Sequence, residues 1–279
     1  MDLSVALAVL LAALLHATWN ALLKSGKDML LDTAAIVIGG GVVAVPLVLV
    51  VAVPPAASWP YIAGSALIHI AYYLLMVNAY RAGDLSLVYP LMRGTAPMIT
   101  AVLGVLALHE WPGPLSCLGI ALISLGVFAL ALRTVDHRPS RAAVGFALAN
   151  AAVIATYTII DGQGARVAQD AWSYICWLFV VDAVPFTLLV AYLRRGSFAA
   201  AMCERRWRGL LGGGLSATAY AISVWAMTKA PVALVASLRE TSVLFAALIA
   251  ARVLRERLSA RRWAGACAIV LGALALKLA

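Results

Sequence analysis

Charged residues are scarce in this chain of 279 residues. Asp, Glu, Lys and Arg make up 12% of it, whereas hydrophobic residues make up 64%, and the mean hydropathy is +0.98. A soluble domain carries about 25% charged and about 45–50% apolar residues. So few polar side chains cannot cover the surface of a water-soluble globule. The composition therefore predicts an integral membrane protein.

Motifs for catalysis and metal binding are missing as well. The four cysteines, Cys117, Cys176, Cys203 and Cys267, form no CxxC pair, and the four histidines show no ligand spacing. We find no G-x-S-x-G, H-E-x-x-H or Walker motif. We therefore expect no enzyme activity, no metal and no cofactor, and a carrier or facilitator rather than an ATP-driven pump. The cysteines are expected to pack as small apolar residues.

Apolar runs of membrane-spanning length fill most of the chain. A spanning helix needs about 20 mostly apolar residues, and the first run lacks the positive start of a cleaved signal peptide. The sequence thus predicts an all-α membrane protein with ten transmembrane helices and no soluble domain, the longest loop being Arg194–Arg206. The predicted spans are Leu3–Leu23, Thr33–Val53, Pro60–Ala82, Leu85–Leu108, Gly113–Leu132, Ala142–Asp161, Ala171–Leu193, Arg208–Thr228, Val232–Leu254 and Ser259–Leu278.

The sequence contains an internal repeat. At an offset of 146 positions, Met92–Leu132 and Leu238–Leu278 share about a dozen of roughly forty residues, including Arg93 with Arg239 and Thr95 with Thr241. Each half, 1–137 and 138–279, then contains five predicted spans. Because five is odd, the second half must insert upside down relative to the first. The sequence predicts an inverted-topology repeat of five plus five helices.

Basic residues are unevenly distributed between the loops. The odd-numbered loops hold sixteen Lys and Arg residues, and the even-numbered loops with the tail hold three. By the positive-inside rule, the odd loops lie in the cytoplasm and both termini outside. The net charge of +9 is therefore explained by topology. We expect the lipid bilayer and a small-molecule substrate as partners, and no nucleic acid.

Two arginines within predicted spans are the sharpest functional candidates. The repeat places Arg93 and Arg239 opposite one another, and an ionisable residue in the membrane indicates function. A pair of guanidinium groups there suits the carboxylate or phosphonate of a substrate. The alternative is that each arginine reaches the membrane interface or pairs with a loop carboxylate.

Glu240 and Asp182 are the candidate ion-coupling acids, because a carboxyl group within the membrane can load and release a proton. A permanent salt bridge between Glu240 and Arg239 is the alternative.

Polar and aromatic side chains on several spans could line a pocket for an amphiphilic small molecule, although each alone is commonly a core or interface residue. These side chains are Trp19, Asn20, Tyr72, Tyr73, Tyr89, Tyr157, Tyr220 and Trp225.

Two further patterns concern packing. Gly119/Gly126 and Gly265/Gly272 are small residues seven apart, which lets helices approach closely within a chain or in a homodimer. The prolines Pro46, Pro90, Pro97 and Pro185 are predicted to interrupt helices.

The opening pattern His16-Ala-Thr-Trp-Asn-Ala-Leu-Leu-Lys24 resembles the start of EamA-type members of the drug/metabolite transporter superfamily. The two copies ending in Glu110 and Glu256 are similar to them too. The stretch from Tyr89 to Pro97 resembles a subgroup associated with phosphonate utilisation. The resemblance implies a ten-helix inverted-repeat transporter of small metabolites with both termini in the cytoplasm. That orientation is the opposite of the one that the loop charges predict.

We therefore expect a multi-pass protein of the cell (inner) membrane. Its predicted function is secondary-active transport, by export or import, of a small anionic or zwitterionic metabolite such as an amino acid or aminophosphonate. Alternating access around a central cavity would move the substrate. The alternatives are a lipid-linked sugar flippase, a multidrug efflux carrier and a membrane protein without transport activity.

Overall fold

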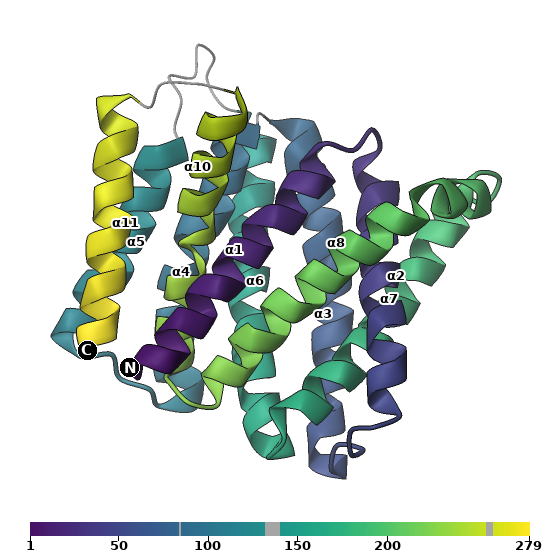
Figure 1. The fold of residues 1–279 in the computed structure, drawn as a ribbon, viewed down its shortest axis with the longest axis horizontal. Helices are drawn as coiled ribbons and strands as arrows, with labels where there is room; N and C mark the ends of the chain where they lie inside the picture. The colour runs from purple at the N-terminus through teal and green to yellow at the C-terminus, as the bar shows by residue number, and fades with distance from the viewer. Residues whose placement is uncertain (84, 132–139, 255–258) are drawn as a thin grey trace.

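The computed structural model describes residues 1–83, 85–131, 140–254 and 259–279. Every regular element in these ranges is helical, as the sequence predicts (Figure 1). A short 3-10 turn, Ala56–Ser58, precedes α3. The helices are α1 Leu3–Lys24, α2 Met29–Val48, α3 Trp59–Ala82, α4 Leu85–Leu108, α5 Pro114–Ala131, α6 Arg141–Ala168, α7 Ala171–Leu193, α8 Phe198–Met227, α9 Val232–Arg239, α10 Ser242–Leu254 and α11 Ala260–Leu278.

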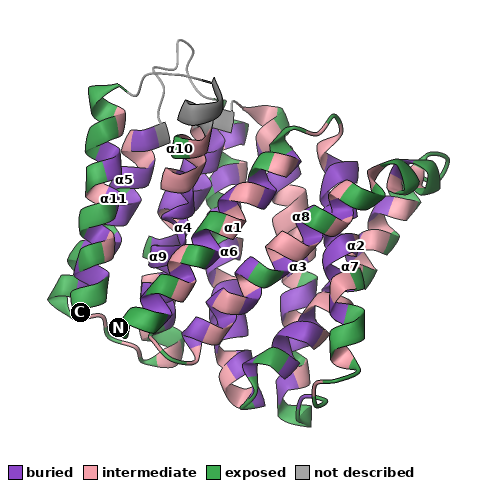
Figure 2. Cartoon of the chain, in the orientation of Figure 1, coloured by how far each residue is buried: buried purple, intermediate pink, exposed green. Residues whose placement is uncertain are grey.

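Apolar residues cover the outside of these helices as well as their core. Leu3, Leu7 and Leu11 point outward from α1, and Leu271 and Leu274 from α11, while the buried residues face the inside of the bundle (Figure 2). Among the described residues, eight helical segments are long and apolar enough to cross a membrane, the eighth being Val232–Ile249, which α9 and α10 share, and Pro114–Leu130 is a shorter apolar helix. Outer faces this apolar are suited to lipid.

Several helix boundaries differ from the predicted ones, such as α2, which covers Met29–Val48 and not Thr33–Val53, and the end of α6 and the start of α8 differ most. α6 continues to Ala168, so Asp161 lies inside a helix and not near its end. α8 begins at Phe198, inside the stretch predicted to be the longest loop. Charged residues end an apolar run, but Arg, Glu, Met and Ala are all good helix formers. The helix therefore extends beyond the apolar segment that hydropathy identifies.

The ninth predicted span is interrupted at Glu240 and Thr241, between α9 and α10. The amide of Glu240 bonds to the carbonyl of Ser237 at 3.0 Å, and that of Thr241 to Leu238 at 3.1 Å. These i to i−3 bonds tighten the backbone, as in the 3-10 turns that mark hinges within helices. No proline lies there, whereas α4 continues through Pro90 and Pro97. Pro46 and Pro185 likewise lie inside the continuous helices α2 and α7. The prediction that these four prolines interrupt their helices is wrong.

Helix packing follows the relation between the two halves. α3 packs on α6 as α8 packs on α1, and α4 packs on α6 as α9 and α10 pack on α1. α5 lies along α11, and α2 lies along both α7 and α8. Both termini are at the same end of the bundle (Figure 1), where the Met1 amino group is 3.4 Å from the Lys277 carbonyl oxygen.

Glycines let two of these helix pairs touch backbone to backbone. A side-chain carbon on Gly126 would lie 2.7 Å from the backbone oxygen of Gly265, and one on Gly272 would lie 2.8 Å from that of Gly119. The predicted glycine faces thus pack α5 on α11 within one chain, while a homodimer stays a prediction. In the same way, a side chain on Gly213 would overlap the backbone of α2.

Ion pairs join helices at both ends of the bundle. At the end that holds the termini, Arg166 pairs with Glu110 at 2.6 Å and donates to the carbonyl oxygen of Met227. At the other end, Arg205 of α8 pairs with Asp32 of α2 at 3.0 Å, and Arg194 pairs with Asp28 at 3.1 Å. The space between these two layers contains the candidate site.

Candidate functional site

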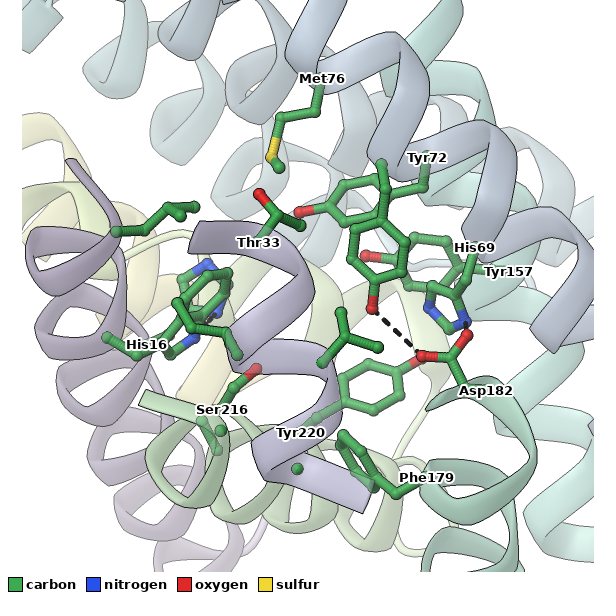
Figure 3. A pocket seen from close by; sticks show the side chains of 18 of the residues that line it. His16, Thr33, His69, Tyr72, Met76, Tyr157, Phe179, Asp182, Ser216 and Tyr220 are labelled. Carbon is green, nitrogen blue, oxygen red and sulfur yellow. Dashed lines mark hydrogen bonds and ion pairs between the residues drawn. The ribbon is translucent and has the colours of Figure 1, made fainter. Parts of the chain in front are cut away.

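A cavity lies inside the bundle, between α1, α2, α3, α6, α7, α8 and α9 (Figure 3). It offers about 80 Å³ to the centres of water-sized molecules, where one water needs roughly 10–15 Å³. Its size therefore suits a small metabolite. Its walls are formed by His16, Trp19, Leu23, Thr33, Ile36, Val37, Gly40, His69, Tyr72, Tyr73, Met76, Tyr157, Leu178, Phe179, Asp182, Gly213, Ser216, Ala219, Tyr220 and Arg239.

Arg239, the last residue of α9, supplies the cationic group in this wall. Only 3% of the residue is exposed, and its guanidinium carbon lies 5.8 Å from the centre of the Tyr220 ring. Within the described part of the chain it forms no ion pair, and its Nε has no hydrogen bond. A buried charge is costly unless it is paired. Arg239 therefore has hydrogen-bonding capacity left beside the cavity.

Arg93 of α4, in contrast, already has a carboxylate beside it. Its Nε lies 2.7 Å from Oε2 of Glu240, and the side chains are 4% and 1% exposed. The contact is an ion pair without the N–H direction of a hydrogen bond at these two atoms. Arg239 also attracts the charge of Glu240. The predicted alternative, a salt bridge of Glu240 with Arg239, is therefore replaced by one with Arg93.

An acidic group, Asp182 of α7, occupies another part of the wall. The Tyr73 hydroxyl donates to its Oδ2 at 3.1 Å, and Nδ1 of His69 lies 3.5 Å from its Oδ1 (Figure 3). Asp182 is 5% exposed. The cavity therefore has a carboxylate and a guanidinium group in its walls, on α7 and α9.

A second acid, Asp161 of α6, lies behind Tyr220. The Tyr174 hydroxyl donates to its Oδ1 at 2.9 Å, and the Tyr220 hydroxyl donates to its Oδ2. Asp161 is completely buried. Tyr220 thus joins the two charges, because its ring faces Arg239 and its hydroxyl binds Asp161.

Polar groups from the second half of α1 line the cavity and a smaller cavity beside it. The Trp19 indole donates to Nδ1 of His16 at 3.3 Å, and the Asn20 amide donates to the His16 carbonyl oxygen at 2.9 Å. A polar amide in the membrane needs a hydrogen-bond partner, and for Asn20 that partner is the backbone of its own helix.

The structure brings together most of the predicted site residues. Trp19, Tyr72, Tyr157, Tyr220, Asp182 and Arg239 line the cavity. Asn20, Tyr89 and Arg93 line a smaller adjoining cavity, which shares His16 and Tyr72 with the first. The roles assigned to all these residues stay predictions.

Trp225 lines neither cavity and packs against apolar core residues instead. Its position near the end of α8 carries it past the cavity. Conversely, Thr33, Phe179 and Ser216 line the cavity although no sequence pattern singled them out. Hydroxyl and aromatic residues are too common in membrane helices for one of them to be informative alone.

Comparison with known proteins agrees with this arrangement of two halves. The sequence profile of the EamA-like transporter family matches residues 3–132 and again residues 141–278. The chain belongs to the EamA-like transporter family. The EamA-like family is a family of membrane transporters for small molecules and not of enzymes, and the chain is accordingly a multi-pass membrane protein of a transporter family.

The fold of this EamA-like chain also recurs among solved structures. One, described only as a crystal structure of a protein, aligns with a TM-score of 0.77 over 100% of this chain and 98% of its own length. The two sequences are 19% identical, so the likeness concerns the fold alone. No curated protein matches the sequence of this EamA-like chain.

Proposed function

We propose that this EamA-like chain is a secondary-active transporter of a small anionic or zwitterionic metabolite, which moves by alternating access around the cavity. In this proposal the chain crosses the cell (inner) membrane ten times as an inverted repeat of five plus five helices. The exchanged packing of α3 on α6 and α8 on α1 supports the repeat.

The observation that carries the proposal is the unpaired guanidinium group of Arg239. A buried cation that forms no ion pair within the described residues is most stable when an anion enters the cavity. Its planar group can hold a carboxylate or phosphonate through two parallel hydrogen bonds. We propose Arg239 as the group that binds the anionic end of the substrate.

Cavity size supports a small substrate over a lipid-linked sugar or a large drug. A volume of about 80 Å³ has room for several waters at roughly 10–15 Å³ each. A lipid-linked sugar would need a larger space with a lateral opening. A small metabolite is accordingly the better candidate for transport.

We propose ion coupling for Glu240 and Asp182, which have different surroundings. Asp182 lines the cavity, whereas Glu240 lies against Arg93. Uptake into vesicles should then respond to an imposed proton gradient. A flux that ignores both the gradient and Glu240→Gln would contradict coupling at Glu240.

The proposed function is tested with purified protein. A thermal-shift screen against amino acids, aminophosphonates and organic acids identifies a ligand, whose flux is then measured in proteoliposomes. Arg239→Ala should weaken binding by roughly 10- to 100-fold, because a hydrogen bond to a charged group contributes about 1.5–3 kcal/mol. Arg239→Lys should restore binding only in part, since Lys lacks the planar fork.

Arg195→Ala is the matched control, because Arg195 is exposed and lies over the Tyr192 ring, away from the cavity. It should bind and transport as the unmodified protein does. Unchanged flux in Arg239→Ala would overturn the proposed anion site. Arg93→Ala is a poorer test, because it leaves Glu240 buried without its partner.

A further inference from the structure

Asp182, the acidic group in the cavity wall, has a carboxylate oxygen without a hydrogen bond. Asp182 accepts one hydrogen bond, from Tyr73, at its Oδ2. Its Oδ1 is buried, has no hydrogen bond, and approaches Nδ1 of His69 only at 3.5 Å. An ionised carboxylate has about four acceptor sites. Asp182 therefore keeps accepting capacity beside the cavity.

Tyr73 and His69, which contact this carboxylate, belong to a group of packed aromatic rings. The His69 ring lies 4.4 Å from that of Tyr157, 6.0 Å from Tyr73 and 6.3 Å from Tyr220, measured between ring centres. Tyr72 lies 5.6 Å from Tyr157. These residues come from α3, α6 and α8 and meet at the Asp182 side of the cavity (Figure 3). We name His69, Tyr72, Tyr73, Tyr157 and Tyr220 the aromatic cluster.

A carboxylate within an aromatic cluster is chemically suited to a cation. The faces of Tyr rings attract an ammonium group, and the attraction grows when the site excludes water. The carboxylate supplies a charge-assisted hydrogen bond, which is stronger than a neutral one. An anion would be repelled by Asp182, and a neutral apolar group would leave Oδ1 unpaired.

We propose that Asp182 and the aromatic cluster form a subsite for an ammonium group of the substrate. The inference rests on the proposed function and narrows it, because the substrate must then carry a cation for Asp182 as well as an anion for Arg239. The substrate class is a small zwitterionic amine, such as an amino acid or an aminophosphonate. Tyr220 belongs to the aromatic cluster and its ring also faces Arg239, so it contributes to both subsites.

The test compares three forms of each compound by thermal shift and by flux in proteoliposomes. They are the parent amine, its N-acetyl derivative and the deaminated acid, for example alanine, N-acetylalanine and propionate, or 2-aminoethylphosphonate with its two counterparts. The unmodified protein should prefer the parent by about tenfold or more, which corresponds to about 1.4 kcal/mol. A deaminated acid that binds as tightly as its parent would overturn the subsite.

Variants then show which residues cause the preference for the parent amine. Asp182→Asn should remove it, so that the parent and the deaminated acid bind alike, while Asp2→Asn, an exposed carboxylate at the N-terminus, should keep it. Tyr157→Phe keeps the ring and should retain the preference, whereas Tyr157→Leu should weaken it several-fold. If Asp182→Asn does not fold, the comparison of compounds on the unmodified protein and on the two Tyr157 variants still decides.

The failures of the two proposals are distinguishable. If deaminated acids are bound and transported as well as their parents, the anion transport proposed above stands and the ammonium subsite falls. If Asp182→Asn alters only the dependence on a proton gradient, Asp182 is a coupling group alone and the subsite again falls. If no compound of any form binds or crosses the membrane, both proposals are overturned.

Discussion

Two buried guanidinium groups and one buried carboxylate meet where α4 and α9 face each other. Arg93 lies 2.7 Å from Glu240, and Arg239 is close enough to attract the same carboxylate. With Glu240 ionised, the three side chains carry a net charge of about +1. This surplus is the physical reason to expect an anion at Arg239.

Removing the Glu240 charge should destabilise the protein. In Glu240→Gln, Arg93 loses its ion-pair partner while it stays buried, and breaking a buried pair on one side costs about 3–5 kcal/mol. The thermal unfolding midpoint in detergent should fall clearly. The double variant Arg93→Met/Glu240→Met should be much less destabilised, because no charge is left unpaired.

One result would count against this interpretation. If the double variant is destabilised by as much as Arg93→Met and Glu240→Met added together, the ion pair makes no specific contribution to stability. Asp170→Asn is a useful control. It changes a carboxylate that caps α7 by accepting from the Trp172 amide, outside the site.

At the scale of the elements, close helix packing depends on individual glycines. Gly126 and Gly265 place the backbones of α5 and α11 against one another, and no larger residue fits at either position without a shift. In a bilayer, such packing replaces the hydrophobic effect as a source of helix association. The interface should therefore be sensitive to a single methyl group.

Gly126→Ala should destabilise the protein by about 1–3 kcal/mol, because overpacking forces the helices apart. Gly145→Ala is the matched control: it also lies in a helix, but nothing lies within 4 Å of the added carbon. It should be neutral or slightly stabilising, since Ala favours a helix over Gly by up to about 1 kcal/mol. Thermal unfolding in detergent measures both, and equal effects would contradict the packing argument.

The second element of note is the interruption between α9 and α10. In the first half, the corresponding helix α4 is continuous, and Gly94 stands where the second half has Glu240. A side-chain carbon on Gly94 would lie 2.8 Å from the Phe128 ring. The halves thus differ at the position of the buried ion pair, although their other contacts are related.

At the scale of the whole molecule, a group of basic residues and the termini lie at opposite ends. Lys24 at the end of α1, Arg194 after α7 and Arg205 near the start of α8 lie at one end, and Met1 touches Lys277 at the other. The loop charges predict that the termini lie outside the cell, whereas the family resemblance implies that they lie inside.

Fusions at Ala279 test the orientation. The loop charges predict an active alkaline-phosphatase fusion and a non-fluorescent GFP fusion, and the reverse pattern would overturn the charge rule here. An impermeant thiol reagent gives an independent check, because the exposed Cys117 and Cys203 lie at opposite ends. In intact cells it should label Cys117 and spare Cys203, and permeabilised cells should label both.

The sequence alone determined the helical class, the duplication and most of the spans. Apolar runs without water as a partner for the backbone must become helices, and a shared offset for Arg93 and Arg239 is visible without any structure. It also singled out Tyr72, Tyr157, Tyr220 and Asp182, because polar groups within apolar helices are conspicuous. All four line the cavity, and their roles stay predictions. Helix ends were predicted less well, since hydropathy reports which residues suit the lipid and not which residues form helical hydrogen bonds.

Only the tertiary structure decided which charges are paired. The sequence places Glu240 next to Arg239, but adjacent side chains point in different directions, so Glu240, at the interruption after α9, reaches Arg93 on α4. The same packing leaves Arg239 at the cavity and brings Tyr73 and His69 to Asp182. Partner choice depends on distances between helices far apart in the chain, and local sequence does not specify those distances.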